Sequence, residues 1–327
     1  MSRFHYAFDW AQRAVRSERL PTAVLGIATS EGVQAVEAFG ATGDRRADVS
    51  DYFPLFSVTK PIVGLAALRQ VERGLLTPDT PLALAVPDFG SGRDDTVRLR
   101  HLVSHTSGIP DVPLDAPRGL RESLLTPGRI FAAGTASRYS SIAFEGIAAL
   151  IEHVTGEPWR ASVDELLKDA GAEGITFDPE CDAHPVCDID AAGFDYKRFQ
   201  TLAHPGAGLF ARVQDILALG VALLRDDGAV ASPLAIQSMR RPLTEGVPRL
   251  EPVPAGDGQD WGFTWNVRNR APGLLSRDVY GHSGWAGCQF WINPATRVAY
   301  ALLTNRAAPE RFDVDFDELQ NAVDAAA

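Results

Sequence analysis

Strand-like runs stand near both ends of this chain, and helical patterns fill the long stretch between them. The runs 23–29 and 33–39 flank Ser30-Glu31-Gly32, turn chemistry that predicts a β-hairpin. Further strand-like runs are 262–267, 278–282, 287–293 and 298–304. Strands at both ends predict an antiparallel sheet assembled from both termini, with a largely helical insertion.

Apolar residues at helical spacing predict the helices of this chain. The predicted segments are 3–17, 61–76, 98–104, 142–155, 161–169, 213–224 and 314–325. Together with the strands they predict an α/β (α+β) fold, an antiparallel β-sheet flanked by helices with a mostly helical inserted domain. We expect one domain from residues 1–70 and 205–327, a mainly helical domain from 71–204, and an active site in the cleft between them.

Charge and hydropathy exclude several classes of partner. Acidic residues outnumber basic ones 42 to 31, a net charge of -11 that repels phosphate backbones and anionic lipid, so we expect neither nucleic acid nor membrane as a partner. No run approaches about 18 consecutive apolar residues, and the N-terminal residues lack a secretory apolar stretch. The three cysteines suit a reducing compartment, and we expect a cytoplasmic protein. No pattern indicates an oligomeric state.

A possible metal site is limited to one short segment. Cys181, His184 and Cys187 are close in sequence, but they do not follow a recognised zinc spacing. We therefore expect no metal there, and no cofactor elsewhere.

Ser57-Val-Thr-Lys60 places a hydroxyl and an amine three residues apart at the predicted start of a helix. At that spacing both side chains emerge on one face, and a deprotonated amine can activate a serine. The helix N-terminus also favours developing negative charge. Taken alone, the pattern fits an N-cap serine beside a solvated lysine better than it fits a catalytic pair. Apolar runs on both sides, Phe53 to Phe56 and Pro61 to Leu68, favour a buried lysine and hence a functional one.

At this point the sequence resembles a known family, the serine β-lactamases of class C, the D-alanyl-D-alanine peptidases and the β-lactamase-like esterases. Six segments resemble the family's elements in the expected order over residues 53–305. The segments after the Ser57 motif are 102–109, 138–141, 205–209 with Asp215, 261–265 and 281–287, and the run 290–305 resembles the two closing strands.

The resemblance implies roles for individual residues. It implies that Ser57 is the nucleophile, that Lys60 activates it, and that Tyr139 relays a proton to the leaving group. It leaves open which of Lys60 and Tyr139 is the base at rest. It further implies that the edge at His282, Ser283 and Gly284 lines the cleft, where the N–H of Trp285 would join that of Ser57 as an oxyanion hole. Such a hole stabilises the tetrahedral intermediate of acyl transfer.

Two positions depart from the family pattern. His282 stands where penicillin-binding relatives usually have lysine, and histidine is largely neutral near pH 7. Ser141 stands where they have asparagine, which removes an amide that would hold substrate or lysine. Both changes weaken the expectation of β-lactam turnover. We expect a serine hydrolase whose partner is a small-molecule ester, amide or lactam substrate, most readily a small ester, with β-lactamase or D-amino-acid peptidase or amidase activity as the alternative.

Other classes of function fit the sequence less well. Gly281 to Trp285 resembles the nucleophile elbow of α/β-hydrolases, but no histidine follows His282 to complete a triad. His101 and His105 are four apart on a predicted helix, yet no third metal ligand stands at a suggestive spacing. A non-catalytic binding protein on this fold would be expected to lose Ser57 or Lys60.

Overall fold

Eight antiparallel strands form the main sheet of the computed structural model, which describes residues 3–250, 258–271, 273–274 and 276–327. The strand order is β3-β2-β1-β10-β9-β8-β7-β6, so the first strands pair directly with the last one. The strands are β1 (Thr22–Thr29), β2 (Gly32–Thr42), β3 (Arg45–Arg46), β6 (Asp260–Trp261), β7 (Asn266–Val267), β8 (Tyr280–Ser283), β9 (Gln289–Asn293) and β10 (Val298–Leu303). A second small sheet pairs β4 (Phe53–Pro54) with β5 (Phe210–Ala211). The antiparallel sheet built from both ends of the chain is confirmed.

Ten α-helices lie in the described residues, most of them between β4 and β6. They are α1 (His5–Arg16), α2 (Thr59–Glu72), α3 (Leu99–Val103), α4 (Leu120–Leu124), α5 (Ala143–Thr155), α6 (Trp159–Asp169), α7 (Tyr196–Thr201), α8 (Val213–Arg225), α9 (Pro233–Met239) and α10 (Phe316–Asp324). Every helix predicted from periodicity is present. The short helices α4, α7 and α9 were not predicted, because five to seven residues carry too little periodicity to recognise.

The prediction of one strand over residues 262–267 is wrong. The chain forms the two short strands β6 and β7 there, joined by a turn in which the Gly262 N–H donates to the Trp265 carbonyl at 2.8 Å. Thr264 within the turn has a φ of 66°, which a strand cannot contain. Pattern alone could not separate these cases, because the turn residues Phe263 and Trp265 are buried and apolar like those of a strand.

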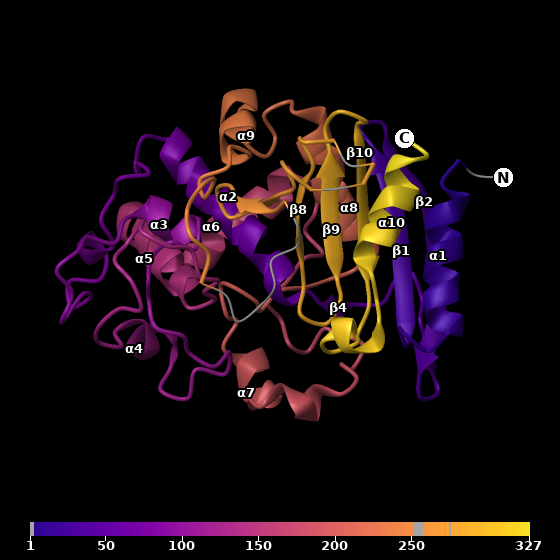
Figure 1. Ribbon diagram of the computed structural model, residues 1–327, viewed down its shortest axis with the longest axis horizontal. Coiled ribbons are helices and arrows are strands. Elements are labelled where there is room, and N and C mark those ends of the chain that lie inside the picture. Colours follow the sequence, from indigo (N-terminus) through magenta and orange to yellow (C-terminus); the bar gives the residue numbers. More distant parts are fainter. Residues whose placement is uncertain (1–2, 251–257, 272, 275) are drawn as a thin grey trace.

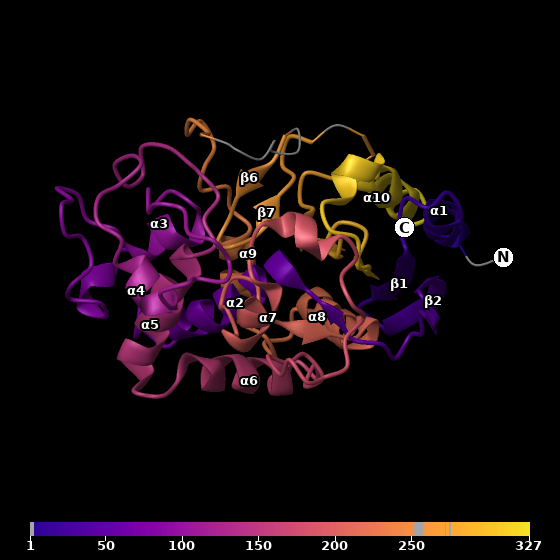
Figure 2. The ribbon, with the colours of Figure 1, turned by 90° about the horizontal axis from the view of Figure 1, so that it is seen from below.

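The sheet is covered on both faces, with α1 and α10 on one face and α8 on the other (Figures 1 and 2). Side chains of β1 alternate between the two layers. Leu25 and Ile27 belong to the cluster beneath α1 and α10, while Val24 and Ala28 belong to the cluster that contains α8. Gly26 lies so close to α8 that an added Cβ would stand 2.5 Å from Leu217. Burial on both faces makes β1 a continuous apolar run.

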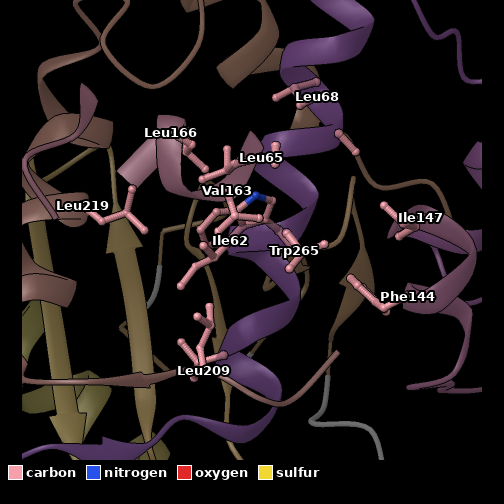
Figure 3. Packing of buried hydrophobic residues seen from close by; sticks show 14 of the residues in the cluster. Ile62, Leu65, Leu68, Phe144, Ile147, Val163, Leu166, Leu209, Leu219 and Trp265 are labelled. Carbon is pink, nitrogen blue, oxygen red and sulfur yellow. The ribbon is translucent and has the colours of Figure 1, made fainter. Parts of the chain in front are cut away.

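Helix α2 connects the sheet layer to the helical part of the chain. It packs against α5 and α6, and nearly all of its residues are buried. One continuous hydrophobic cluster surrounds it (Figure 3), with Ile62, Leu65 and Leu68 from α2, Phe144 and Ile147 from α5, Val163 and Leu166 from α6, Leu219 from α8, and Trp265. The core fixes α2, and with it the turn at its N-terminus. The division into two domains stays a prediction.

Within the described residues, none of the helices combines the length and the apolar character needed to cross a lipid bilayer.

Candidate active site

Ser57 lies in a single 3₁₀ turn, Phe56–Val58, which runs directly into α2. The turn is closed by the Val58 N–H, which donates to the Leu55 carbonyl at 3.2 Å. The Ser57 side chain is half-buried, so it stays open to a substrate. The predicted position of Ser57 at a helix entrance is confirmed.

The residue before the serine has an unusual backbone conformation. Phe56 has a φ of 45°, in the left-handed region that costs a bulky residue about 1–3 kcal/mol. Its fully buried ring stacks on Phe199 at a centroid distance of 5.5 Å and meets the edge of Trp285 at 5.4 Å. This packing offsets the strain and holds the sharp turn that presents Ser57.

Lys60 is completely buried, and its amine touches the nucleophile. The Nζ atom lies 3.0 Å from Ser57 Oγ, 3.0 Å from Ser141 Oγ and 2.7 Å from the Gly206 carbonyl oxygen. Within the described residues no carboxylate forms an ion pair with it. Burial therefore holds the pKa of Lys60 well below 10.5.

The amine donates in all three contacts when it carries three protons, and it can keep two of them and act as a base in the third once it loses a proton. The deprotonated form is the one that matters for catalysis. It has two protons and one lone pair, and the Gly206 carbonyl can only accept. One proton therefore goes to Gly206 and the second can go to Ser141. In the deprotonated form the lone pair is then left for Ser57, so the contact in which Nζ donates to Ser57 Oγ can reverse and the hydroxyl can donate to the amine. Lys60 is thus placed to take the Ser57 proton as that oxygen attacks a carbonyl.

Tyr139 forms one wall around the amine. Lys60 Nζ lies 4.6 Å from the centre of its ring, and the ring packs against His105 at 4.5 Å and Trp261 at 5.5 Å. The structure thus brings Tyr139 beside the Ser57 and Lys60 pair. Which of Lys60 and Tyr139 is the base at rest stays open, and the proton relay through Tyr139 stays a prediction.

His105 holds the backbone that carries Tyr139. Its Nδ1 accepts from the Ser140 N–H at 3.1 Å, and its carbonyl accepts from the Arg138 N–H at 2.9 Å. The ring is fully buried, which keeps its pKa well below 6.5. His101 instead accepts from the Arg98 N–H at 3.1 Å, so the Nδ1 lone pairs of both histidines are already used.

The segment with Cys181, His184 and Cys187 has a structural contact instead of a metal-like arrangement. His184 Nε2 lies 2.8 Å from Asp51 Oδ2, and burial raises the pKa of the Cys181 thiol to about 11. Among the described residues no group of three or more His, Cys, Asp or Glu side chains could hold a metal ion.

His282 is a neutral, buried side chain at the end of β8. Its Nδ1–H donates to the Ser283 carbonyl at 2.8 Å, and its ring lies 6.1 Å from Tyr139 and 5.5 Å from Trp261. Burial lowers its pKa to about 3. His282 therefore supplies no positive charge near pH 7, in agreement with the sequence-based expectation of weak carboxylate recognition.

Gly284 brings the end of β8 against the nucleophile turn. A Cβ added to it would lie 2.3 Å from the Leu55 carbonyl oxygen, so only glycine allows this approach. Within the described residues, neither the Ser57 N–H nor the Trp285 N–H has a backbone or side-chain acceptor. Two unused N–H groups on adjoining segments are the arrangement that an oxyanion hole needs.

Gly284→Ala is expected to lower kcat for an ester by about 10²-fold, the usual effect of losing one oxyanion donor. The added methyl group must push β8 away from Leu55, and the Trp285 N–H moves with it. Steady-state kinetics on p-nitrophenyl butyrate, with circular dichroism to show an intact fold, measure the effect. Gly43→Ala is the control for the general cost of replacing a glycine, because no atom lies within 4 Å of the added Cβ, and its φ of 59° puts backbone strain far from Ser57 instead of a clash at β8. Wild-type kcat in Gly284→Ala would contradict this role.

Sequence reasoning missed the contacts that come from the main chain. Gly206 lies in the quoted run 205–209. Its carbonyl accepts a hydrogen bond from the Lys60 amine, but a backbone acceptor cannot be recognised from the type of residue. His204 Nδ1 accepts from the Gly206 N–H at 2.9 Å and so fixes that peptide. Trp261 was quoted only as part of a segment, and the structure packs it on His105, Tyr139 and His282.

An antiparallel sheet with helices between its strands, and a serine in contact with a buried lysine beside it, define the serine hydrolases of the penicillin-recognising class. The Beta-lactamase family model matches residues 8–324, and the chain therefore belongs to the β-lactamase family.

Several characterised relatives and solved structures resemble the chain. Esterase EstB of Burkholderia gladioli is 28% identical, with 94% of this chain and 90% of that protein covered. Esterase/beta-lactamase LipL of Mycobacterium tuberculosis is 26% identical, with 84% and 75% covered. The structure of EstCE1, described as a hydrolase with promiscuous acyltransferase activity, matches with a TM-score of 0.78 at 21% identity over 98% of this chain and 97% of that one. A penicillin-binding protein homologue from Caulobacter crescentus matches with a TM-score of 0.80 at 18% identity over 100% and 98%.

Proposed function

We propose that this protein is a carboxylesterase that hydrolyses small esters through an acyl-enzyme on Ser57. The observation that carries the proposal is the fully buried amine of Lys60, 3.0 Å from the Ser57 hydroxyl and without a carboxylate partner among the described residues. Burial lowers the pKa of this amine well below 10.5 and so favours its deprotonated form, and a deprotonated amine beside a serine serves nucleophilic catalysis.

The reaction proceeds in two halves. Ser57 Oγ attacks the ester carbonyl while its proton passes to Lys60 Nζ, and the carbonyl oxygen takes up negative charge between the N–H groups of Ser57 and Trp285. The ester C–O bond then breaks, and the departing alcohol oxygen receives the proton, with Tyr139 as the relay. Water attacks the acyl-enzyme in the second half, loses a proton to the same amine and releases the carboxylic acid and Ser57.

Esters are favoured over β-lactams by the strand edge beside the serine. A β-lactam or a peptidyl-D-alanine carries a carboxylate, and a positively charged side chain in the cleft would bind it. His282 does not supply that charge, because its pKa is about 3 and the ring is neutral. Among similar proteins, EstB is named an esterase and LipL an esterase/beta-lactamase. Hydrolysis of β-lactams or of D-amino-acid peptides is the second candidate, because a putative D-alanyl-D-alanine carboxypeptidase of Escherichia coli is 22% identical over 80% of this chain.

Acyl transfer follows from the same intermediate when an alcohol, in place of water, attacks the acyl-enzyme. The fold match to EstCE1 makes it worth measuring. The three cysteines are all free, which supports the proposal that the protein acts in the reducing cytoplasm.

The experiment compares p-nitrophenyl butyrate, nitrocefin and a D-alanyl-D-alanine peptide as substrates of the purified wild-type protein. We expect the ester to have the highest kcat/KM, with nitrocefin at least about tenfold lower because its carboxylate finds no cation. The Ser57→Ala protein gives the background rate for each substrate. Efficient nitrocefin turnover with negligible ester hydrolysis would reverse the proposed order.

A further inference from the structure

The Gly206 carbonyl makes the shortest of the three contacts of the Lys60 amine. Its oxygen lies 2.7 Å from Lys60 Nζ, against 3.0 Å for each of the two serine hydroxyls. A carbonyl accepts from an amine in either protonation state, but a hydrogen bond to a charged group is roughly twice as strong as one between neutral groups. This contact therefore stabilises the protonated amine more than the neutral one.

Ester hydrolysis requires the Lys60 amine to take up a proton as well as to give one up. In the proposed reaction Nζ receives the Ser57 proton while the Ser57 oxygen bonds to the ester carbonyl carbon. The amine then carries three protons until one of them passes to the leaving oxygen. Burial opposes this charged form, since it holds the pKa of Lys60 well below 10.5. The Gly206 carbonyl counteracts burial while the charge develops, and an interaction that strengthens at that point raises kcat.

Gly206 cannot hold its carbonyl in place by itself. An added Cβ would lie 2.8 Å from the Ser141 carbonyl oxygen, so the close approach of this segment to Ser141 requires glycine. Glycine has more accessible backbone conformations than any other residue. The direction of the Gly206 carbonyl must therefore be fixed by contacts with another residue.

His204 fixes both peptide groups that flank Gly206. Its Nδ1 accepts from the Gly206 N–H at 2.9 Å, and its carbonyl oxygen accepts from the Ala207 N–H at 2.9 Å. The Ala207 N–H and the Gly206 carbonyl belong to one planar peptide group, so the second bond orients the carbonyl that faces Lys60. The first bond fixes the other side of Gly206, and it alone depends on the type of side chain at position 204.

The His204 ring remains an acceptor near neutral pH. Burial lowers its pKa to about 3, so Nδ1 keeps its lone pair and the ring carries its proton on Nε2. The other titratable side chains around the amine are Tyr139, whose ring lies 4.6 Å from Nζ, and the imidazoles of His105 and His282, which pack on that ring. Burial keeps both imidazoles neutral near pH 7.

We propose that His204 is a positioning residue of this site, which holds the Gly206 carbonyl on the Lys60 amine and so stabilises the protonated amine during ester hydrolysis. The inference rests on the proposed esterase function and assigns a further residue to the same site. Its direct consequence is that the protonated amine becomes less stable when the His204 acceptor is removed.

Substitutions at position 204 separate hydrogen bonding from packing. His204→Asn keeps an acceptor, because an asparagine side chain bonds to the N–H two residues further along the chain, but it fills less of the buried space. His204→Leu and His204→Phe fill the space and have no acceptor. A residue that only packs would tolerate leucine or phenylalanine better than asparagine, whereas a residue that positions Gly206 tolerates asparagine better.

His101→Leu is the matched control. His101 is also buried and also accepts from a backbone N–H, that of Arg98 at 3.1 Å, but it makes no contact with Gly206. Its replacement therefore reports the general effect of losing a buried histidine that accepts from the main chain.

The pKa of Lys60 can be measured directly, because the chain has three lysines and the other two, Lys168 and Lys197, are exposed. Nuclear magnetic resonance of protein labelled with ¹³C at lysine Cε follows each amine, and Lys60→Met identifies the Lys60 signal. We expect this pKa to fall by about one unit in the leucine and phenylalanine variants, which lose an acceptor for a charged group. It should move by less than about 0.3 unit in His204→Asn and His101→Leu. An unchanged or raised pKa in the acceptor-free variants would overturn the inference.

Steady-state kinetics on p-nitrophenyl butyrate give the second readout. We expect kcat to fall about tenfold in the acceptor-free variants while KM changes less than about twofold, because the lost interaction strengthens only when the amine is charged. His204→Asn should stay within about threefold of the wild type and His101→Leu within about twofold. Circular dichroism checks the fold of each variant.

Wild-type kcat in the acceptor-free variants would overturn the inference, as would a lower kcat in His204→Asn than in His204→Leu. A wild-type rate no higher than that of Ser57→Ala would instead show that the esterase function fails. The titration of Lys60 needs no turnover, so it tests the role of His204 in that case as well.

Discussion

Replacing Lys60 by methionine is expected to lower kcat/KM for p-nitrophenyl butyrate by about 10³-fold, within the range of losing a general base. Methionine nearly fills the space of the buried lysine stem and has no basic atom. Ser57 then keeps its proton and attacks poorly, because the contact between Lys60 Nζ and Ser57 Oγ is lost. Steady-state kinetics measure the loss.

The same variant should change how stability depends on pH. Since the pKa of Lys60 is lowered in the folded protein, the unfolded chain binds one more proton between that folded pKa and about 10.5. In this range the wild type loses up to about 1.4 kcal/mol of unfolding free energy for each unit that pH falls. Lys60→Met has no such group, so its stability relative to the wild type should improve steadily as pH falls.

Urea denaturation at several pH values between 6 and 9 measures this difference. Ser57→Ala is the matched control, because it also lacks activity but keeps the buried amine and should keep the wild-type slope. Parallel pH curves for the wild type and Lys60→Met would show that Lys60 is protonated in the folded state. An unchanged kcat/KM in Lys60→Met would rule it out as the base.

Ser57→Ala is expected to lower ester hydrolysis by at least about 10⁴-fold, because removal of a nucleophile ends covalent catalysis. The fold should be unaffected, since Ser57 is half-buried and its hydroxyl contacts only Lys60 among the described residues. A fluorophosphonate probe, followed by peptide mass spectrometry, should label Ser57 in the wild type and nothing in the variant. Labelling of another serine, or equal hydrolysis by the variant, would assign the chemistry elsewhere.

Much of the fold could be predicted because each main element carries its own periodic pattern. The hairpin of β1 and β2, the buried α2 and the closing strands β9 and β10 all follow from apolar spacing. We predicted a strand where the turn between β6 and β7 lies. Its residues are buried and apolar, as strand residues are, whereas most turns are exposed and polar. The short helices α4 and α7 are among the elements that the sequence did not predict.

The part of the site that could be predicted is the part in which the type of side chain indicates a chemical role. Ser57 and Lys60 were recognisable from spacing and apolar flanks, and the structure brings Tyr139 and Ser141 to them. The Gly206 carbonyl was not recognisable, because a backbone acceptor has no residue type.

The pairing of β1 with β10 sets the order in which this enzyme can be completed during synthesis. Ser57 and Lys60 leave the ribosome early, yet β1 finds its second neighbour only when residues 298–303 have been made. Gly284, which lies against the Leu55 carbonyl at the nucleophile turn, and Trp285, the proposed second oxyanion donor, also arrive late. A nascent chain therefore carries its nucleophile long before it can form an oxyanion hole, and such distant pairings are slow to form. The apolar β1 must meanwhile be protected from aggregation, which makes α1 and β2, the first segments able to cover it, important for folding yield.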